Sequence, residues 1–584
     1  MRKPAVFLAV FMLVLSACTG GSPDSVSDNV SDRDFLQLAA SEPNTLDPHL
    51  VTDVGSHRYT SNLYGNLLRL DPALYDADGN LVAVGGEITQ DMIEQYRRGE
   101  LTASAEVVAD LAESIPDPEY NDDGTVSYTF TLRENVRFSS HTEENPHPVT
   151  AWDVAYSIER AADPDTRSTT AELYLGDILG IMDMQYGRID NRVHPDEEQV
   201  TVDLPGIEVV DERTIKLTAD GGIVSDVFLM KLTYPTASVV DKVQAESAAR
   251  WTHRPNATGP YVLVKRDASE IIMEANPNYH GDKPKIDKVV YKLASANTFQ
   301  RYQAGEFDLT GVGVEDLDML AQVRDLSTDV SKQYFETPDM ATSYIGLNNI
   351  AAPFDDPLVR RAFALAFDRK AIAETVLQDL VVPAYGILPP GIPGYRDDFR
   401  GQDYDPDEAR RLLAESSYAG NMPRIKLTVS GSGSSPSVVL QSIVENWRTE
   451  LGVDVEFEQV DYATFLEELN KGSFQAFSLG WVADYPDPED FLDLKFHSLR
   501  SSANNETRYS NPEVDALLEE ARVERDPEKR IALYHKAEEM IAEDAPWIVL
   551  FHSKNSVLVK PYLCGYMPTP MAISIIRYVS FCES

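Results

Sequence analysis

The 584-residue chain has little cysteine, and it carries none of the familiar catalytic signatures. Its ten histidines are scattered, and neither H-E-x-x-H, G-x-S-x-G, a P-loop nor a complete G-x-G-x-x-G occurs. A clustered nucleophile and base are therefore not evident. These absences favour a binding protein over an enzyme, and they indicate neither a cofactor nor a metal.

Positive charge is also scarce, because 95 Asp and Glu outnumber 51 Lys and Arg and give a net charge of −44. Such an excess argues against a nucleic-acid partner and against a surface that lies flat on anionic lipid. It says little about the ligand, since most carboxylates occupy solvated faces.

Long apolar runs are missing except at the start of the chain. Arg2 and Lys3 precede an apolar run at residues 5–15, which is too short to span a bilayer. The following Leu-Ser-Ala-Cys, at 15–18, resembles the lipobox of bacterial lipoproteins, in which Cys18 would be acylated. We expect a signal peptide at 1–17 and a lipidated flexible tether at 18–34. An ordinary signal peptide with a chance cysteine is the alternative.

This start predicts an extracytoplasmic protein that a lipid at Cys18 anchors to the outer face of the cell membrane, at the cell surface or in the periplasm. The other two cysteines, Cys564 and Cys582, form an even pair in an exported chain. A disulfide between them is expected. Two free thiols are the alternative, because sequence gives no geometry.

Strand and helix signals alternate along the mature chain, which is long enough for two or three domains. Alternating or apolar runs predict strands at 126–132, 214–218, 289–293, 425–429 and 453–457. Capping signals and helical spacing predict helices from Asp356 onward, at 437–451, at 513–522 and at 527–541. Residues 75–104 and 139–148 read as surface insertions.

The most informative stretch is Gly480 to Leu492, where Asp484 stands between Trp481 and Tyr485. A carboxylate beside aromatic rings suits a ligand that carries an amine, because the rings add apolar walls and cation–π attraction. The alternative is structural: Asp484 opens the turn that the two following prolines require, and the aromatic rings pack in the core.

An ordered series of motifs resembles the peptide-binding solute-binding proteins of ABC importers, family 5. The series covers nearly the whole mature chain and runs through residues 42–49, 150–157, 251–252, 258–261, 276–279, 302–308, 353–362, 368–369, 480–492, 501–505 and 509. The resemblance implies an α/β, two-lobed periplasmic-binding-protein-like fold of type II, large cluster, with an extra inserted domain and a two-strand hinge.

By this resemblance the first lobe comprises 35–64, 208–294 and 549–584, the extra domain 65–207, and the second lobe 295–548. The hinges would fall near 293–295 and 548–550. The ligand would lie in the cleft between the lobes, and the protein would deliver it to an ABC permease while acting as a monomer.

The resemblance also assigns roles to individual residues. Asp484 would pair with the α-amino group of a bound peptide, and Gly480, Val482 and Val54 would meet its main chain. Trp481 would form a side-chain pocket wall, with Tyr485 as the second aromatic. No basic residue is identified for the peptide carboxyl end, so ligand length is open. A nickel chelate, an oligosaccharide or an opine on the same fold, a secreted hydrolase, and a peptide sensor are the alternatives.

Overall fold

The structure is a computed structural model, and it describes residues 35–139, 147–188, 204–222, 224–247, 250–293, 295–325, 327–431, 436–571, 573 and 575–582. The expected signal peptide, Cys18, the tether and residues 140–146 of the second insertion lie outside the described residues. Among the helices in these ranges, none combines the length and the apolar character needed to cross a bilayer.

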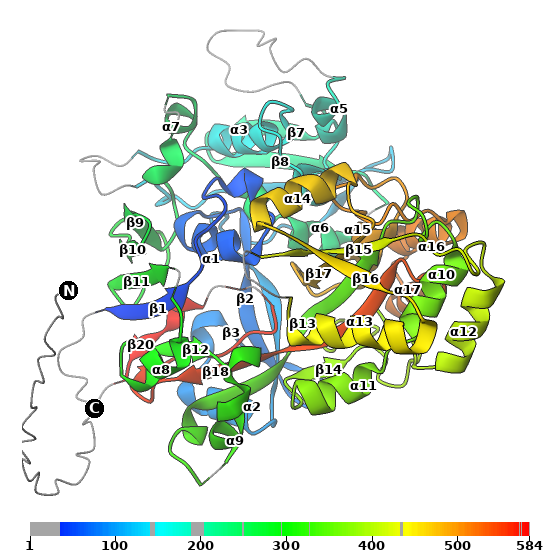
Figure 1. The fold of residues 1–584 in the computed structure, drawn as a ribbon. Coiled ribbons are helices and arrows are strands. Elements are labelled where there is room, and N and C mark those ends of the chain that lie inside the picture. Colours follow the sequence, from blue (N-terminus) through cyan, green and yellow to red (C-terminus); the bar gives the residue numbers. More distant parts are fainter. Residues whose placement is uncertain are drawn as a thin grey trace, which may run out of the picture. The chain divides into compact units, whose positions relative to one another are not determined.

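One mixed sheet of eleven strands organises the fold (Figure 1). Its order is β16 (Val455–Val460), β15 (Ile425–Ser430), β17 (Ala476–Val482), β13 (Tyr334–Leu347), β18 (Trp547–Val559), β12 (Leu309–Gly311), β1 (Leu36–Ala40), β11 (Lys288–Leu293), β10 (Glu270–Ala275) and β9 (Tyr261–Arg266), with β14 (Val381–Pro383) paired to β18. Early, middle and late strands therefore share a sheet, as the blue β1, green β12 and red β18 of Figure 1 show.

Three smaller sheets accompany it. They are β3 (Leu81–Val84), β2 (Leu68–Tyr75) and β4 (Thr102–Ala109); β5 (Glu119–Tyr120), β6 (Val126–Thr131), β8 (Thr214–Ala219) and β7 (Ile207–Asp211); and β19 (Leu563–Cys564) with β20 (Ser580–Phe581). The predicted domain limits stay predictions. The pairing of β6 with β8, however, favours an extra domain that continues past 207 to Ala219.

Helices surround these sheets. They are α1 (Val54–Leu63), α2 (Gln90–Arg97), α3 (Ala151–Ala162), α4 (Ala171–Tyr174), α5 (Ile181–Gln185), α6 (Ser225–Lys231), α7 (Lys242–Ser247), α8 (Thr298–Gln303), α9 (Leu317–Arg324), α10 (Pro357–Leu365), α11 (Arg369–Ala371), α12 (Pro406–Glu415), α13 (Val438–Leu451), α14 (Tyr462–Lys471), α15 (Leu492–Phe496), α16 (Pro512–Val523) and α17 (Pro527–Asp544).

The predicted elements are present, and their ends follow their caps. The Asp356 side chain accepts the backbone N–H of Leu358 at the start of α10, and Ser437 caps α13 in the same way. The strand expected at 453–457 begins two residues later, at Val455.

The first predicted insertion is more than a surface segment, which corrects that expectation. Its helix α2 buries Ile93 completely in the core around β1 and β11. The Arg97 guanidinium donates to the carbonyl oxygens of Ser331 and Tyr334, at 2.9 and 3.1 Å. The helix is amphipathic, so one face packs while the other stays in solvent.

Candidate ligand-binding site

Three adjoining cavities surround the carboxyl end of β17. We call them cavity A, about 160 Å³, cavity B, about 60 Å³, and cavity C, about 830 Å³. The residues that two cavities share are His57, Tyr234 and Asp484 for A and B, Val54 and Val482 for A and C, and Met571 and Ile573 for B and C. Because each pair shares two or three lining residues, the three cavities lie next to one another.

Asp484 lies where cavities A and B meet, two residues after β17 ends. The Tyr174 hydroxyl, from α4, donates a hydrogen bond to the Asp484 carboxylate across 310 positions of sequence. The backbone N–H of Asp484 donates to Asp490 Oδ2 at 3.0 Å. These contacts fix both the direction of the carboxylate and the turn that carries it.

The electrostatics of this carboxylate are unusual. Burial raises the pKa of Asp484 to about 7, and the Tyr174 hydrogen bond and the Lys495 ammonium offset only part of that rise. Burial, together with the neighbouring Asp484, also raises the pKa of Asp490 well above its ordinary range. A carboxylate whose charge is this costly gains from any ligand that brings a cation to it.

Trp481 forms part of the wall of cavity A. Its indole N–H donates to Asp490 Oδ2 at 3.2 Å, and the Lys495 ammonium lies 4.1 Å from its ring centroid. Lys495 in turn donates to Glu506 Oε1 at 2.5 Å. The Trp481 ring thus lies at the cavity, as predicted, and the Lys495 ammonium of the protein itself already lies against it.

Gly480 and Val482 also line cavity A, in the last part of β17. On one edge they pair with Ser343 and Ala341 of β13. On the other edge β15 pairs with β17 only at Ala476 and Phe477, so within the described ranges no strand covers residues 478–482. An uncovered strand edge at a cavity offers main-chain donors and acceptors to an extended ligand.

Val54 is the first residue of α1 and is 43% exposed. The Asp53 side chain caps this helix by accepting the N–H of Ser56 at 2.9 Å. Val54 and Val482 line both cavity A and cavity C. The two valines therefore lie where cavity A borders cavity C.

Tyr485 is placed differently from the other predicted residues. It is 1% exposed, its hydroxyl donates to Glu489 Oε2 at 2.7 Å, and it packs in a cluster with Tyr174 and Tyr234. It is absent from the linings of cavities A, B and C. Its role in ligand binding stays a prediction.

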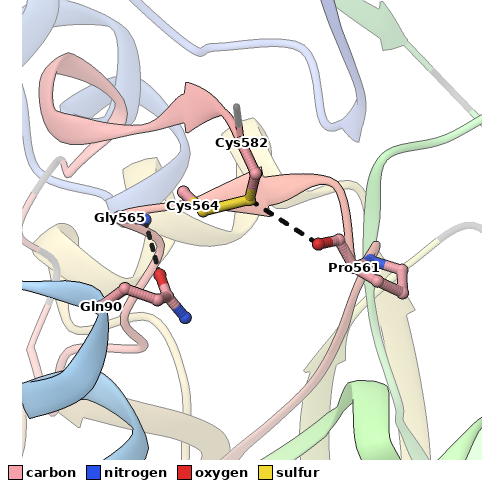
Figure 2. Close-up of a disulfide and its surroundings, with 5 residues drawn as sticks. All are labelled: Gln90, Pro561, Cys564, Gly565 and Cys582. Atoms are coloured by element: carbon pink, nitrogen blue, oxygen red, sulfur yellow. Dashed lines mark hydrogen bonds between the residues drawn. A yellow bond between two sulfur atoms is a disulfide. The ribbon is translucent and has the colours of Figure 1, made fainter. Parts of the chain in front are cut away.

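The carboxyl-terminal part of the chain is held by a disulfide (Figure 2). Cys564 and Cys582 are bonded with their Cα atoms 5.1 Å apart, and Gly565 N–H donates to the Gln90 side chain at 3.1 Å. Met567 and Met571, inside this disulfide loop, line cavity C. The disulfide loop therefore restrains the carboxyl-terminal segment covalently and also contributes to the wall of cavity C.

Sequence reasoning missed Tyr174 and this apolar wall. Tyr174 stands in a four-residue helix without any motif, and its ring stacks on Tyr234 with centroids 3.8 Å apart. The even pair of cysteines was the available signal for the wall, since it indicated that the terminus is fixed in place.

The fold and the cavities define a solute-binding protein, and the comparisons agree. Residues 106–503 match the model of the bacterial extracellular solute-binding proteins, family 5. That match covers more than half of the chain, so the chain belongs to this family, as its motifs predicted.

Particular relatives span nearly its whole length. The chain is 28% identical to the periplasmic oligopeptide-binding protein OppA of Salmonella typhimurium over 97% of this chain and 96% of that protein. It is also 28% identical to heme-binding protein A of Haemophilus influenzae, over 99% of each. Haemophilus influenzae OppA, solved in complex with RPPGFSPFR, matches with a TM-score of 0.74 at 24% identity, covering 94% of this chain and 99% of that one. These matches confirm the two-lobed α/β binding-protein fold.

Proposed function

We propose that this protein captures peptides by binding their amino terminus. Oligopeptides are the ligands to test first. The observation that carries the proposal is the Asp484 carboxylate at the junction of cavities A and B, with its raised pKa and without a lysine or arginine ion pair among the described residues. A peptide α-ammonium would supply the missing counter-charge, and the uncovered edge of β17 would pair with the first residues of the ligand.

Main-chain recognition explains how one site could accept many sequences. Gly480 and Val482 offer backbone groups rather than side-chain chemistry, and cavity C provides space beyond them. Affinity would come from the ammonium and the backbone, while side chains enter roomy cavities. The relatives named for oligopeptides support this assignment.

The cellular role follows from the same proposal. Acylated at Cys18, the chain would be a monomeric receptor outside the cytoplasm that hands its ligand to an ABC permease and catalyses no reaction itself. Lobe closure around the ligand would create the surface that the permease recognises. Globomycin-sensitive processing and membrane fractionation of the protein, compared with Cys18→Ser, test the anchor.

Calorimetry with a tetrapeptide and its N-acetylated form tests the amino-terminal anchor. Acetylation removes the ammonium, and we expect it to weaken binding by about thirtyfold or more. Asp484→Ala should weaken binding of the free-amine peptide by a similar factor and leave the acetylated peptide unaffected. Equal affinity for both peptides in the wild-type protein would refute the anchor.

Haem is a second candidate ligand, because one relative of equal identity and similar coverage is named a heme-binding protein. Mass spectrometry of ligand that co-purifies with the protein, with a hemin titration followed by absorbance, separates the two. Saturable hemin binding without any peptide binding would replace the peptide proposal, and recovery of sugars or nickel chelates alone would do the same.

A further inference from the structure

Cavity C contains a carboxylate that the proposed amino-terminal anchor does not use. Asp339 lies on β13 and lines cavity C together with Val482 and the disulfide-loop residues Met567 and Met571. Among the described residues no lysine, arginine or histidine forms an ion pair with it. Asp339 therefore lines the cavity without an ion-pair partner among the described residues.

A bulge in β13 explains this placement. The pairing of β13 with β18 joins Pro338 to Lys554 and Thr342 to His552, so three residues of β13 stand opposite one residue of β18. Asp339 is the first of the three, and Met340 N–H donates out of the ladder to the Pro570 carbonyl at 2.7 Å. Bulges change the direction of the side chains they carry, and this one is fixed to the disulfide loop.

Both apolar and charged residues line the cavity around Asp339. Burial raises its pKa to about 7. Arg58 of α1, Glu315 and Lys554 also line cavity C, and Lys554 already donates to Glu336 at 3.0 Å. Burial and, to a lesser extent, the nearby Asp339 charge raise the pKa of Tyr96 of α2, whose hydroxyl donates to the Pro568 carbonyl.

We propose that Asp339 is a second recognition group of the ligand cavity, which selects peptides carrying a lysine or arginine side chain beyond the amino-terminal residue. The long aliphatic stem of such a side chain would pack on Met567 and Met571, and its cationic end would meet the Asp339 carboxylate. The inference rests on the proposed peptide function and names a substrate class for it.

The test uses tetra-alanine amides in which position 2, 3 or 4 is lysine or norleucine. Norleucine keeps most of the stem and lacks the ammonium, and the amide removes the ligand carboxylate that Arg58 could attract. In the full-length protein at pH 8 we expect lysine to bind at least tenfold more tightly than norleucine at one position. In Asp339→Asn the lysine and norleucine peptides should bind with about equal affinity, while the affinity for the norleucine peptides stays unchanged.

Two matched variants and a pH series complete the test. Glu315→Gln and Arg58→Ala change other charges of the same cavity, and neither should reduce the lysine preference. In the wild-type protein the affinity for the lysine peptide, divided by the affinity for the norleucine peptide, should rise from pH 5.5 to pH 8 as Asp339 loses its proton. Any effect of Asp484 cancels in this ratio because both peptides carry the same α-ammonium.

The outcomes separate the two proposals. A wild-type protein that binds these peptides without preferring lysine at any position, or a preference that persists in Asp339→Asn, overturns the role of Asp339 and leaves the amino-terminal anchor standing. A preference lost in Glu315→Gln instead assigns the subsite to Glu315 and also overturns it. Failure of every peptide to bind the wild-type protein overturns the peptide function itself.

Discussion

Asp484→Asn is expected to stabilise the unliganded protein while it weakens peptide binding. The folded protein raises the pKa of Asp484 to about 7, against about 4 for an exposed aspartate. Each unit corresponds to about 1.4 kcal/mol, so a fully buried carboxylate would cost about 4 kcal/mol above pH 7. Because Asp484 is only half-buried and borders two cavities, we expect about 2 kcal/mol.

The pH dependence gives this prediction its direction. Between about pH 4 and pH 7 the folded protein keeps a proton on Asp484 that the unfolded chain has lost, so the wild type loses stability relative to Asp484→Asn as pH rises through that window. Above pH 7 the difference is constant. With about 2.1 cal/mol/K of unfolding entropy per residue, about 2 kcal/mol corresponds to a Tm increase of about 2 °C.

Differential scanning calorimetry of unliganded protein at pH 4.5, 6 and 8 measures the effect. Asp487→Asn is the matched control, since Asp487 lies in the same turn but pairs with Arg530 at 2.6 and 2.8 Å. That control should lower the Tm, because it leaves a buried guanidinium without its partner. A Tm change in Asp484→Asn that is negative at pH 8, or equal at all three pH values, would refute the reasoning.

Three further changes test neighbouring parts of the site. Affinity for a free-amine peptide should fall by up to tenfold per pH unit below pH 7. Tyr174→Phe should move the midpoint of this pH dependence upward, because the Tyr174 hydrogen bond lowers the pKa of Asp484 and its loss raises that pKa; a midpoint that stays in place contradicts this. Gly480→Ala should fold normally, since the nearest atom to an added Cβ lies 3.6 Å away, so a loss of affinity without a loss of Tm would report ligand contact. Replacing Cys564 and Cys582 by serine should cost about 3 kcal/mol, because the bridge closes a loop with a sequence separation of 18; urea unfolding curves that match the wild type would contradict it.

Local sequence signals were sufficient for most elements of the fold. Asp356 and Pro357 give both the N-cap and the first turn of α10, and the alternation at 126–131 gives the strand β6, whose apolar residues are buried. The start of β16 was missed by two residues because its neighbour β15, rather than its own composition, sets where pairing begins. The packing of α2 was missed because Ile93 is buried by partners from remote parts of the chain.

The site was predictable only where a motif ran continuously. Residues 480–484 are contiguous, so their resemblance to the family could be seen, and all five border cavity A or cavity B. Tyr174 could not be found, because a single tyrosine in a four-residue helix carries no signal and meets Asp484 only in the folded chain. Asp339 was still harder to predict. Its position depends on the register shift between β13 and β18 and on the hydrogen bond from Met340 N–H in the bulge to the Pro570 carbonyl. The positions of Tyr174 and Asp339 at the cavities therefore depend on tertiary contacts and strand register, whereas the proposed anchor, Asp484, lies in a motif that the local sequence contains.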